Sequence, residues 1–164
     1  MRAVVQRVSS ASVSIEDVVT ARIGHGLLIF LGIQKGDTPA DVEWLATKVA
    51  NLRIYADADE KMNLSLLDVA RSGTSSDPDL SRDDANALVV SQFTLLASTR
   101  KGNRPSFNDA AAPTEAIPLY ELFLSQLGGL INRPIQAGTF GAMMKVSLVN
   151  DGPVTLVVDS KLRE

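Results

Sequence analysis

The amino-acid sequence predicts a mixed α/β or α+β domain in which two helices cover a largely antiparallel sheet. Three observations support this fold class. Strand-like segments occur in groups, and only two segments have helical periodicity. Residues 27–33 form an unbroken apolar run, which is typical of a strand buried on both faces. The chain of 164 residues shows no repeat or linker, so we expect one domain spanning residues 1–164.

Strands are expected at both ends of the chain and in its middle. Residues 2–8 and 11–15 alternate between apolar and polar side chains, and residues 18–23 are expected to form a hairpin with the second of these segments. A short strand is predicted at residues 53–56 and a longer one at residues 88–96. Three further strands are expected near residues 135–140, 144–149 and 154–158.

The first helix is predicted to begin at Thr38. Thr38 can cap the helix, Pro39 fits the first helical position, and Asp41 is favourable in the first turn. The apolar stripe of this helix consists of Val42, Leu45, Ala46, Val49 and Leu52.

The second helix is predicted from residue 114 to residue 127, with Gly128-Gly129 ending it. Pro118 fits this helix only if it lies in the first turn. Residues 71–86 are rich in Ser, Asp and Gly without periodicity, so we expect a surface loop. The predicted core face of the helix consists of Leu119, Leu122, Phe123 and Leu127.

The composition is that of a soluble globular protein, with 45% hydrophobic and 21% charged residues. No stretch of 18 apolar residues predicts a transmembrane helix, and the N-terminal segment turns polar too early for a signal peptide. We therefore expect a cytoplasmic protein without membrane association.

Cysteine and histidine chemistry is almost excluded. The chain has no cysteine, which removes disulfides, thiol nucleophiles and Cys–zinc sites. The single histidine, His25, lies between two glycines and is expected in a turn. No metal site or cofactor is predicted, so the chemistry must come largely from backbone groups or from the substrate.

The net charge of −3 and the pI of about 5.2 argue against broad, nonspecific nucleic-acid binding. A local basic cluster stands out against this background, formed by Arg100, Lys101 and Arg104. Such a run is usually a solvated loop, but in an acidic protein it is also the best candidate for binding phosphates.

A polar segment, Ser91-Gln92-Phe93-Thr94, lies within the otherwise apolar run 88–96. On a strand, Gln92 and Thr94 would share one face. One interpretation is a half-exposed strand with these two side chains in solvent. The other is a pocket wall, in which the backbone amides near Phe93 and Thr94 stabilise an oxyanion.

The segment Asn-Asp-Gly-Pro-Val-Thr at residues 150–155 lies between two strand-like runs. It predicts a hairpin turn, because Gly152 tolerates a positive φ. Pro153 fixes φ and removes a backbone donor, and a Gly-Pro bond is a place where a cis peptide costs little. The alternative to a plain turn is a rigid tip that reaches into a pocket and senses shape.

These segments together resemble the D-aminoacyl-tRNA deacylase (D-tyrosyl-tRNA deacylase) family. Residues 91–95 and 150–155 look like the two signature motifs of that family, and the resemblance extends from Met1 to about Val158. The chain departs from the family pattern in a longer segment 71–86 and an extended tail, 159–164. Supporting matches lie at residues 5–8, 61–65, 104–107 and 146–149.

The resemblance implies a barrel-like β core and an enzyme that hydrolyses the ester between a D-amino acid and the terminal adenosine of tRNA. The family also removes glycine mischarged onto alanine tRNA. A homodimer is implied, with tRNA and not DNA as the partner. Gly152-Pro153 of each subunit, joined by a cis peptide, would enter the pocket of the other subunit and exclude L side chains.

The resemblance also implies that the free 2′-hydroxyl of the terminal ribose assists the attack, while the protein holds the ester and stabilises the oxyanion. Thr94 is expected to contact the substrate, since no base lies nearby to make it a nucleophile. The catalytic residues carried over are Ser91, Gln92, Phe93 and Thr94. The substrate-binding and filter residues are Gly152, Pro153, Asn150, Met62, Asn63 and Arg7. Of these, Met62 and Asn63 are expected to line the adenosine end, and Arg7 to brace the partner's Gly-Pro segment.

Two other functions remain open at this point. A non-enzymatic RNA-binding module would need a broad basic surface and stacking aromatics, and the pI and the 5% aromatic content argue against it. A general hydrolase would use Ser91 or Thr94 with His25 as its base.

Overall fold

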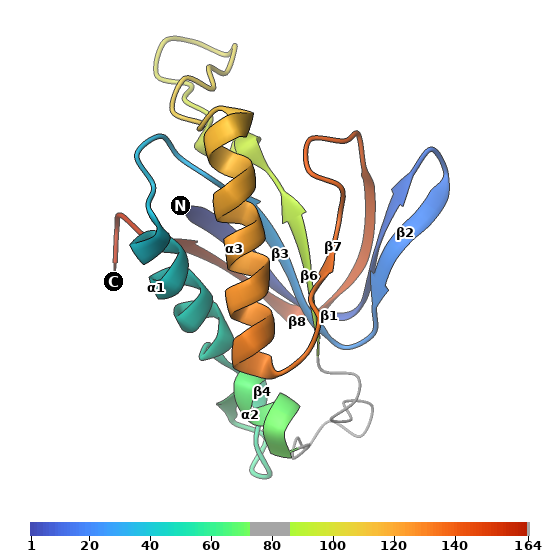
Figure 1. Cartoon of the computed structure of the whole chain (residues 1–164). Helices are drawn as coiled ribbons and strands as arrows, with labels where there is room; N and C mark the ends of the chain where they lie inside the picture. Colours follow the sequence, from blue (N-terminus) through green and yellow to red (C-terminus); the bar gives the residue numbers. More distant parts are fainter. Residues whose placement is uncertain (73–85, 164) are drawn as a thin grey trace.

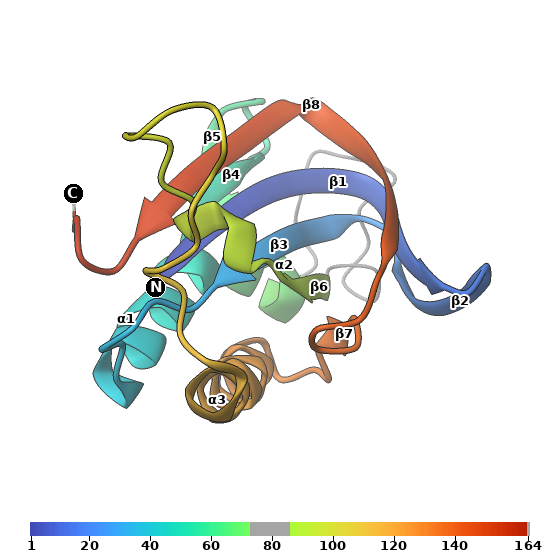
Figure 2. The same cartoon turned by 90° about the horizontal axis from the view of Figure 1, so that it is seen from above.

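The computed structural model describes residues 1–72 and 86–163 and confirms the predicted fold class. Helices α1 (Pro39–Ala50) and α3 (Pro113–Ile131) lie side by side over one face of a largely antiparallel sheet (Figure 1). Viewed along the helix α3, the sheet is strongly curved and nearly closes into a barrel (Figure 2). The two covering helices and the barrel-like core are therefore confirmed.

Strand β1 (Arg2–Ile15) organises the sheet, and the two strands predicted at its position are one. Its first half pairs with β3 (Gly26–Gly32) and its second half with β2 (Val18–Ile23), both antiparallel. Its other edge pairs along its whole length with β8 (Lys145–Asp159). Because neighbouring strands pair with β1 throughout, the polar residues in its middle do not interrupt it.

The remaining strands of the large sheet are parallel to β3. Strand β6 (Asn86–Ser91) pairs with β3, and the two-residue β7 (Gln136–Ala137) pairs with β6, which gives the order β2-β1-β3-β6-β7. The strand predicted at residues 135–140 is thus reduced to two residues. The buried character predicted for β3 is confirmed, since it lies between β1 and β6 with side chains packed on both faces.

Helix α1 begins as predicted. The Asp41 carboxylate accepts hydrogen bonds from the Thr38 amide and hydroxyl, at 2.9 and 3.0 Å, so that the two residues cap the first turn. Four of the five residues of the predicted stripe are buried, and Leu52 follows the end of the helix: the buried four are Val42, Leu45, Ala46 and Val49.

Helix α3 continues beyond its predicted end at Gly128-Gly129. It stops at Ile131, because Asn132 adopts the left-handed conformation with a φ of 55°. Pro118 lies inside the helix, beyond the first turn to which the prediction confined it. Phe123 and Leu127 are buried as predicted, whereas Leu119 and Leu122 are half-buried.

A small second sheet joins β4 (Arg53–Ala56), which was predicted, to β5 (Met62–Ser65), which was not. Helix α2 (Leu66–Ser72) follows at once and takes up the first residues of the predicted 71–86 loop; residues 73–85 lie outside the described residues. The start of α2 has a sequence signal, since Asp68 Oδ2 accepts the Ser65 amide at 2.9 Å and Ser65 Oγ accepts the Asp68 amide at 3.1 Å.

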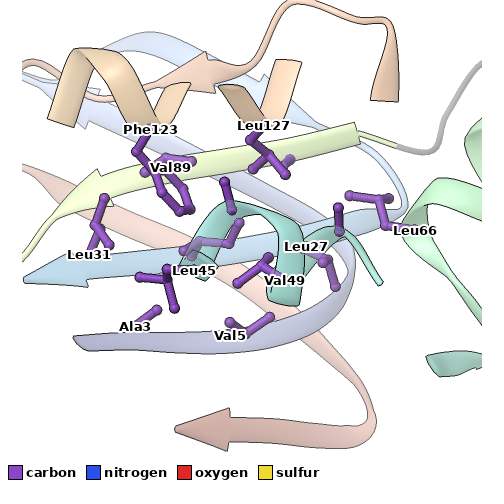
Figure 3. Packing of buried hydrophobic residues seen from close by; sticks show 14 of the residues in the cluster. Ala3, Val5, Leu27, Leu31, Leu45, Val49, Leu66, Val89, Phe123 and Leu127 are labelled. Carbon is purple, nitrogen blue, oxygen red and sulfur yellow. The ribbon is translucent and has the colours of Figure 1, made fainter. Parts of the chain in front are cut away.

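The main hydrophobic core lies between the sheet and the two covering helices (Figure 3). Leu45 and Val49 of α1 and Phe123 and Leu127 of α3 meet Leu27 and other residues of the strands, all fully buried. A second buried cluster fills the inner side of the curved sheet and consists of Val8, Ala11, Val13, Ala21, Ile23, Leu28, Leu88 and Val90. With helices on one face and a filled interior on the other, the ends of β3 and β6 are held rigidly.

Candidate active site

The Ser-Gln-Phe-Thr segment leaves the sheet as soon as β6 ends. The strand predicted to residue 96 stops at Ser91, and Phe93–Leu96 form a 3-10 turn, η1. A Cβ atom at position 32 would stand 3.0 Å from the carbonyl oxygen of Gln92, so Gly32 allows the chain to turn close to β3. The turn therefore lies at the carboxyl ends of two parallel strands, where binding crevices form in α/β sheets.

The amides of Phe93 and Thr94 are the first two of η1, and neither has an acceptor among the described residues. The first amides of a helical turn have no partner within the turn. The Gln92 side-chain amide donates to Thr94 Oγ1, so the two polar side chains contact each other although they do not share a strand face. Neighbouring free amides are suited to a carbonyl oxygen that gains negative charge.

A cavity of about 690 Å³ opens beside this turn. Phe93, whose side chain is 57% exposed, packs edge-to-face against Phe107 with ring centroids 5.0 Å apart. Gly141 donates its amide to Ser91 Oγ at 3.4 Å across the cavity wall. The residues lining the cavity include Ser91, Gln92, Phe93, Thr94, Phe107, Phe140, Met143 and Met144. Its size and mainly apolar lining match those of small-molecule sites.

Among residues 1–72 and 86–163, no charged residue and no histidine lines this cavity. His25 precedes β3, whereas Ser91 pairs with Leu31 at the far end of that strand. At about 3.3 Å per residue, roughly 20 Å of strand separates His25 from Ser91. His25 therefore cannot serve as a base for Ser91 or Thr94, which removes the general-hydrolase alternative.

The Asn-Asp-Gly-Pro segment is not the predicted hairpin turn. The runs on either side of it both belong to β8, and both pair with β1. Asn150 stands opposite Val8, and Thr155 stands opposite Gln6. The four residues 151–154 of β8 therefore face the single residue Arg7 of β1 and form a large bulge. The prediction failed because both halves find their hydrogen-bond partners in a strand that is distant in sequence.

The bulge has the conformation that its sequence favours. Gly152 has a φ of +119°, a region that residues with a side chain rarely adopt, and the Gly152–Pro153 peptide bond is cis. Gly152 and Pro153 are both exposed. The Asn150 side-chain amide fixes the base of the bulge by donating to the carbonyls of Arg7 and Val154, at 2.9 and 3.0 Å.

Arg7 contacts the Gly-Pro bulge of its own chain. Its Nε lies 2.8 Å from Asp151 Oδ2, and its Nη1 donates to the Ile54 carbonyl at 2.5 Å. Arg7 thus holds the Gly-Pro segment of its own chain, and the bracing expected between subunits stays a prediction. The Tyr55 hydroxyl is buried nearby, and its burial raises the pKa of Tyr55, with Arg7 opposing and Asp151 adding to the increase.

Met62 and Asn63 lie on β5 of the small sheet, away from the cavity lining. Two hydrogen bonds hold the Asn63 side chain. Its Oδ1 accepts from Arg53 Nη2 at 2.8 Å, and its Nδ2 donates to Asp57 Oδ2 at 2.5 Å. Met62 is 59% exposed. Strand β5 pairs with β4, and Arg7 donates to the Ile54 carbonyl on β4. Met62 and Asn63 therefore lie on the side of the molecule that carries the bulge.

Arg100, Lys101 and Arg104 are exposed on the loop that follows η1. A two-stranded bridge between Ser98 and Ser106 closes this loop, and Phe107 at its base lines the cavity. The basic cluster is therefore close in sequence to Phe107 of the cavity lining.

The structure divides the predicted site residues into two groups. One group surrounds the cavity: Ser91, Gln92, Phe93 and Thr94. The other surrounds the bulge: Arg7, Met62, Asn63, Asn150, Gly152 and Pro153. None of the second group lines the cavity of its own chain.

Comparison with known proteins decides the family. The family model described as D-Tyr-tRNA(Tyr) deacylase matches residues 4–159, which is nearly the whole chain. The chain belongs to this family. It is a hydrolase that deacylates D-aminoacyl-tRNA, as the relatives below support.

Two relatives match this deacylase over its whole length. The D-aminoacyl-tRNA deacylases of Opitutus terrae and Akkermansia muciniphila are 57% and 54% identical to it over 164 residues, all of each chain. The solved c-Myc DNA Unwinding Element Binding Protein is 37% identical, with a TM-score of 0.83 over 97% of this chain and 98% of the other. A probable eukaryotic D-amino acid tRNA deacylase, 15% identical, with a TM-score of 0.73 over 96% and 97% of the chains, shares the fold.

Several cavity residues of this deacylase were not predicted from its sequence. Phe107 belongs to a segment that matched the family, but Phe140, Met143 and Met144 come from the irregular segment between β7 and β8 and have no local signal. Among residues 1–72 and 86–163, no three His, Cys, Asp or Glu side chains are close enough to hold a metal ion. No helix in the same ranges is long and apolar enough to cross a membrane.

Proposed function

We propose that this deacylase edits D-aminoacyl-tRNA, and glycine mischarged onto alanine tRNA, as a homodimer whose active sites combine residues of both chains. The observation that carries the proposal is the separation of the two site groups. The exposed Gly152-Pro153 bulge lies outside the cavity that holds Ser91–Thr94 in the same chain. A twofold dimer in which each bulge enters the other cavity would bring both groups together.

The edge strand β8 supports such an assembly. Among the described strands β8 pairs only with β1, which leaves its other edge open. Val149 and Val157, on either side of the bulge, are 57% and 68% exposed. Open edges with apolar side chains are sites where a second chain adds.

The proposed chemistry relies on the substrate. Water attacks the ester carbonyl with help from the 2′-hydroxyl of the terminal ribose; the amino acid leaves with the added hydroxyl and the 3′-oxygen of tRNA takes a proton. The described residues that line the cavity are uncharged and offer no competing base. The free amides of Phe93 and Thr94 would stabilise the oxyanion, and the Gln92–Thr94 contact would orient the threonine hydroxyl toward the substrate.

In this assembly Gly152 and Pro153 select by exclusion. Backbone atoms without side chains would occupy the space of an L side chain while leaving room for a D side chain or for the hydrogen of glycine. Asn150 and Arg7 hold that shape. Met62 and Asn63 lie on the same side and would meet the adenosine end, while Arg100, Lys101 and Arg104 bind tRNA phosphates. We place the enzyme in the cytoplasm, where tRNA is charged.

The test compares three substrates of the purified protein: D-tyrosyl-tRNA, L-tyrosyl-tRNA and alanine tRNA mischarged with glycine. We expect release of D-tyrosine and glycine and no release of L-tyrosine. A D-tyrosyl-tRNA with a 2′-deoxy terminal adenosine should be nearly inert. Equal hydrolysis of the two tyrosyl substrates, rapid cleavage of the deoxy substrate, or a monomer at assay concentration would contradict the proposal.

A further inference from the structure

Arg2 links the end of strand β8 to the η1 turn. Its Nη1 donates to the Leu95 carbonyl of η1 at 2.7 Å. Its Nε and Nη2 both lie 2.9 Å from Oδ2 of Asp159, the last residue of β8. One guanidinium thus joins two elements that are far apart in sequence.

Asp159 is itself firmly placed. Its Oδ1 accepts the Lys161 amide at 2.9 Å, and its side chain is only 10% exposed. Arg2 and Asp159 also stand opposite each other in the β1–β8 ladder. Burial tends to raise the pKa of the Asp159 carboxyl, but the Lys161 amide and Arg2 outweigh it and lower the pKa, so the carboxylate is charged.

The η1 turn has few backbone hydrogen bonds of its own. A turn of four residues contains only a few internal hydrogen bonds, and its last carbonyls have no partner within the turn. A charge-assisted bond from Arg2 to Leu95 satisfies one of these carbonyls, and such bonds are stronger than neutral ones. The same turn begins with the free amides of Phe93 and Thr94.

We propose that Arg2, held by Asp159, is a positioning residue that fixes the η1 turn and thereby the Phe93 and Thr94 amides. Arg2 does not line the cavity, so it acts through Leu95 and not through contact with the substrate. This inference rests on the oxyanion role given to the two amides under the proposed function. It assigns a chemical purpose to an ion pair outside both signature motifs.

The variants Arg2→Met, Arg2→Lys and Asp159→Asn test this role in steady-state hydrolysis of D-tyrosyl-tRNA. We expect Arg2→Met to lower kcat about 10-fold with little change in KM, since small displacements of catalytic groups cost about that much or more. The kcat of Arg2→Lys should lie between those of Arg2→Met and the wild type, because lysine lacks the planar fork of the arginine guanidinium. The Arg2→Met/Asp159→Asn double variant should be no slower than Arg2→Met, because the two residues act as a unit.

Amide hydrogen exchange of the segment 91–97 provides a second readout, and it should be faster in Arg2→Met. The matched control is Arg163→Met, which removes another arginine bound to a backbone carbonyl, that of Ser160, without a contact to η1. A folded Arg2→Met enzyme with a kcat within twofold of the wild type, or with unchanged exchange in this segment, would overturn the inference. If Arg2→Met does not fold, the same criteria apply to Arg2→Lys and Asp159→Asn. Failure of the proposed function can be told apart from failure of this inference. In that case the wild-type enzyme itself would hydrolyse D- and L-tyrosyl-tRNA equally or cleave the 2′-deoxy substrate rapidly.

Discussion

Arg7 lies against Gly152 so closely that a Cβ atom on Gly152 would stand 2.9 Å from Arg7 Nη2. The same Cβ would stand 2.8 Å from Val154 Cγ2. The guanidinium is fixed there by Asp151 and by the Ile54 carbonyl, so it cannot move aside freely. The shape of the exposed bulge in β8 therefore depends on a residue of β1 and on the absence of a side chain at position 152.

The substitution Gly152→Ala should destabilise the protein. A φ of +119° is strained for alanine and its methyl group has no room, so we expect a loss of about 1–3 kcal/mol in the free energy of unfolding. Gly129→Ala is the matched control, because nothing lies within 4 Å of the added methyl group and alanine favours the helix. Chemical denaturation of both variants checks this, and equal stability of the two would show that Gly152 is not constrained.

Tyr55→Phe should leave the stability unchanged or raise it. The Tyr55 hydroxyl is buried without a hydrogen-bond partner among the described residues, and removal of such a group relieves its desolvation cost. The matched variant is Tyr120→Phe, whose buried hydroxyl donates to the Val89 carbonyl at 2.9 Å. We expect Tyr120→Phe to cost about 1–2 kcal/mol in thermal or chemical unfolding. If Tyr55→Phe lost more free energy of unfolding than Tyr120→Phe, the Tyr55 hydroxyl would have to make a stabilising interaction, which would contradict this prediction.

Stability should decrease in acid through Asp41. Burial tends to raise the pKa of the Asp41 carboxyl, but hydrogen bonds from Lys161, Thr38 and Ser160 outweigh it and hold the pKa well below its ordinary value. A carboxyl with a lowered pKa in the folded state stabilises the protein above its unfolded pKa, near about 3.9, and this contribution is lost as the pH falls further.

The check on Asp41 is the free energy of unfolding between pH 7 and pH 2. Asp41→Asn should be less stable than the wild type at pH 7, and the difference should shrink below about pH 4. Asp17→Asn is the control, since the side chain of Asp17 is 81% exposed. A difference between Asp41→Asn and the wild type that stays constant down to pH 2 would contradict this prediction.

Mixed dimers should show whether the bulge acts on the partner's cavity. We expect Pro153→Ala to admit L-tyrosyl-tRNA, because the bulge loses the rigidity of proline. Thr94→Val should impair the cavity of its own chain while leaving its bulge intact. Coexpression of Pro153→Ala with an excess of Thr94→Val should restore rejection of the L substrate, since each intact cavity then faces an intact bulge. Unchanged hydrolysis of L-tyrosyl-tRNA in the mixed dimers would place filter and cavity in one chain.

His25→Ala should retain nearly full deacylase activity. His25 and Ser91 lie at opposite ends of the strand pair β3–β6, and no histidine lines the cavity. Steady-state hydrolysis of D-tyrosyl-tRNA checks the prediction. A loss of about 100-fold or more, as expected for a general base, would reinstate a histidine-dependent mechanism.

Local sequence signals predicted those elements whose cause is local. The start of α1 depends on Thr38, Pro39 and Asp41, which lie within one turn, and all three act as predicted. The apolar run of β3 likewise predicted a strand buried on both faces. The same local reading overlooked the Ser65–Asp68 cap of α2, although its signal is of the same kind.

The sequence by itself determined the fold class, the family and the two motifs of the deacylase, because helix caps, hydrophobic periodicity and motif residues are all local properties of the chain. Only the tertiary structure decided that the Gly-Pro segment is a bulge in a continuous strand, that Thr94 lies on a 3-10 turn, and that Arg7 belongs to the bulge. The physical reason is that strand pairing joins residues more than a hundred positions apart: Arg7 faces Asp151 and Arg2 faces Asp159 only because β1 and β8 share a ladder.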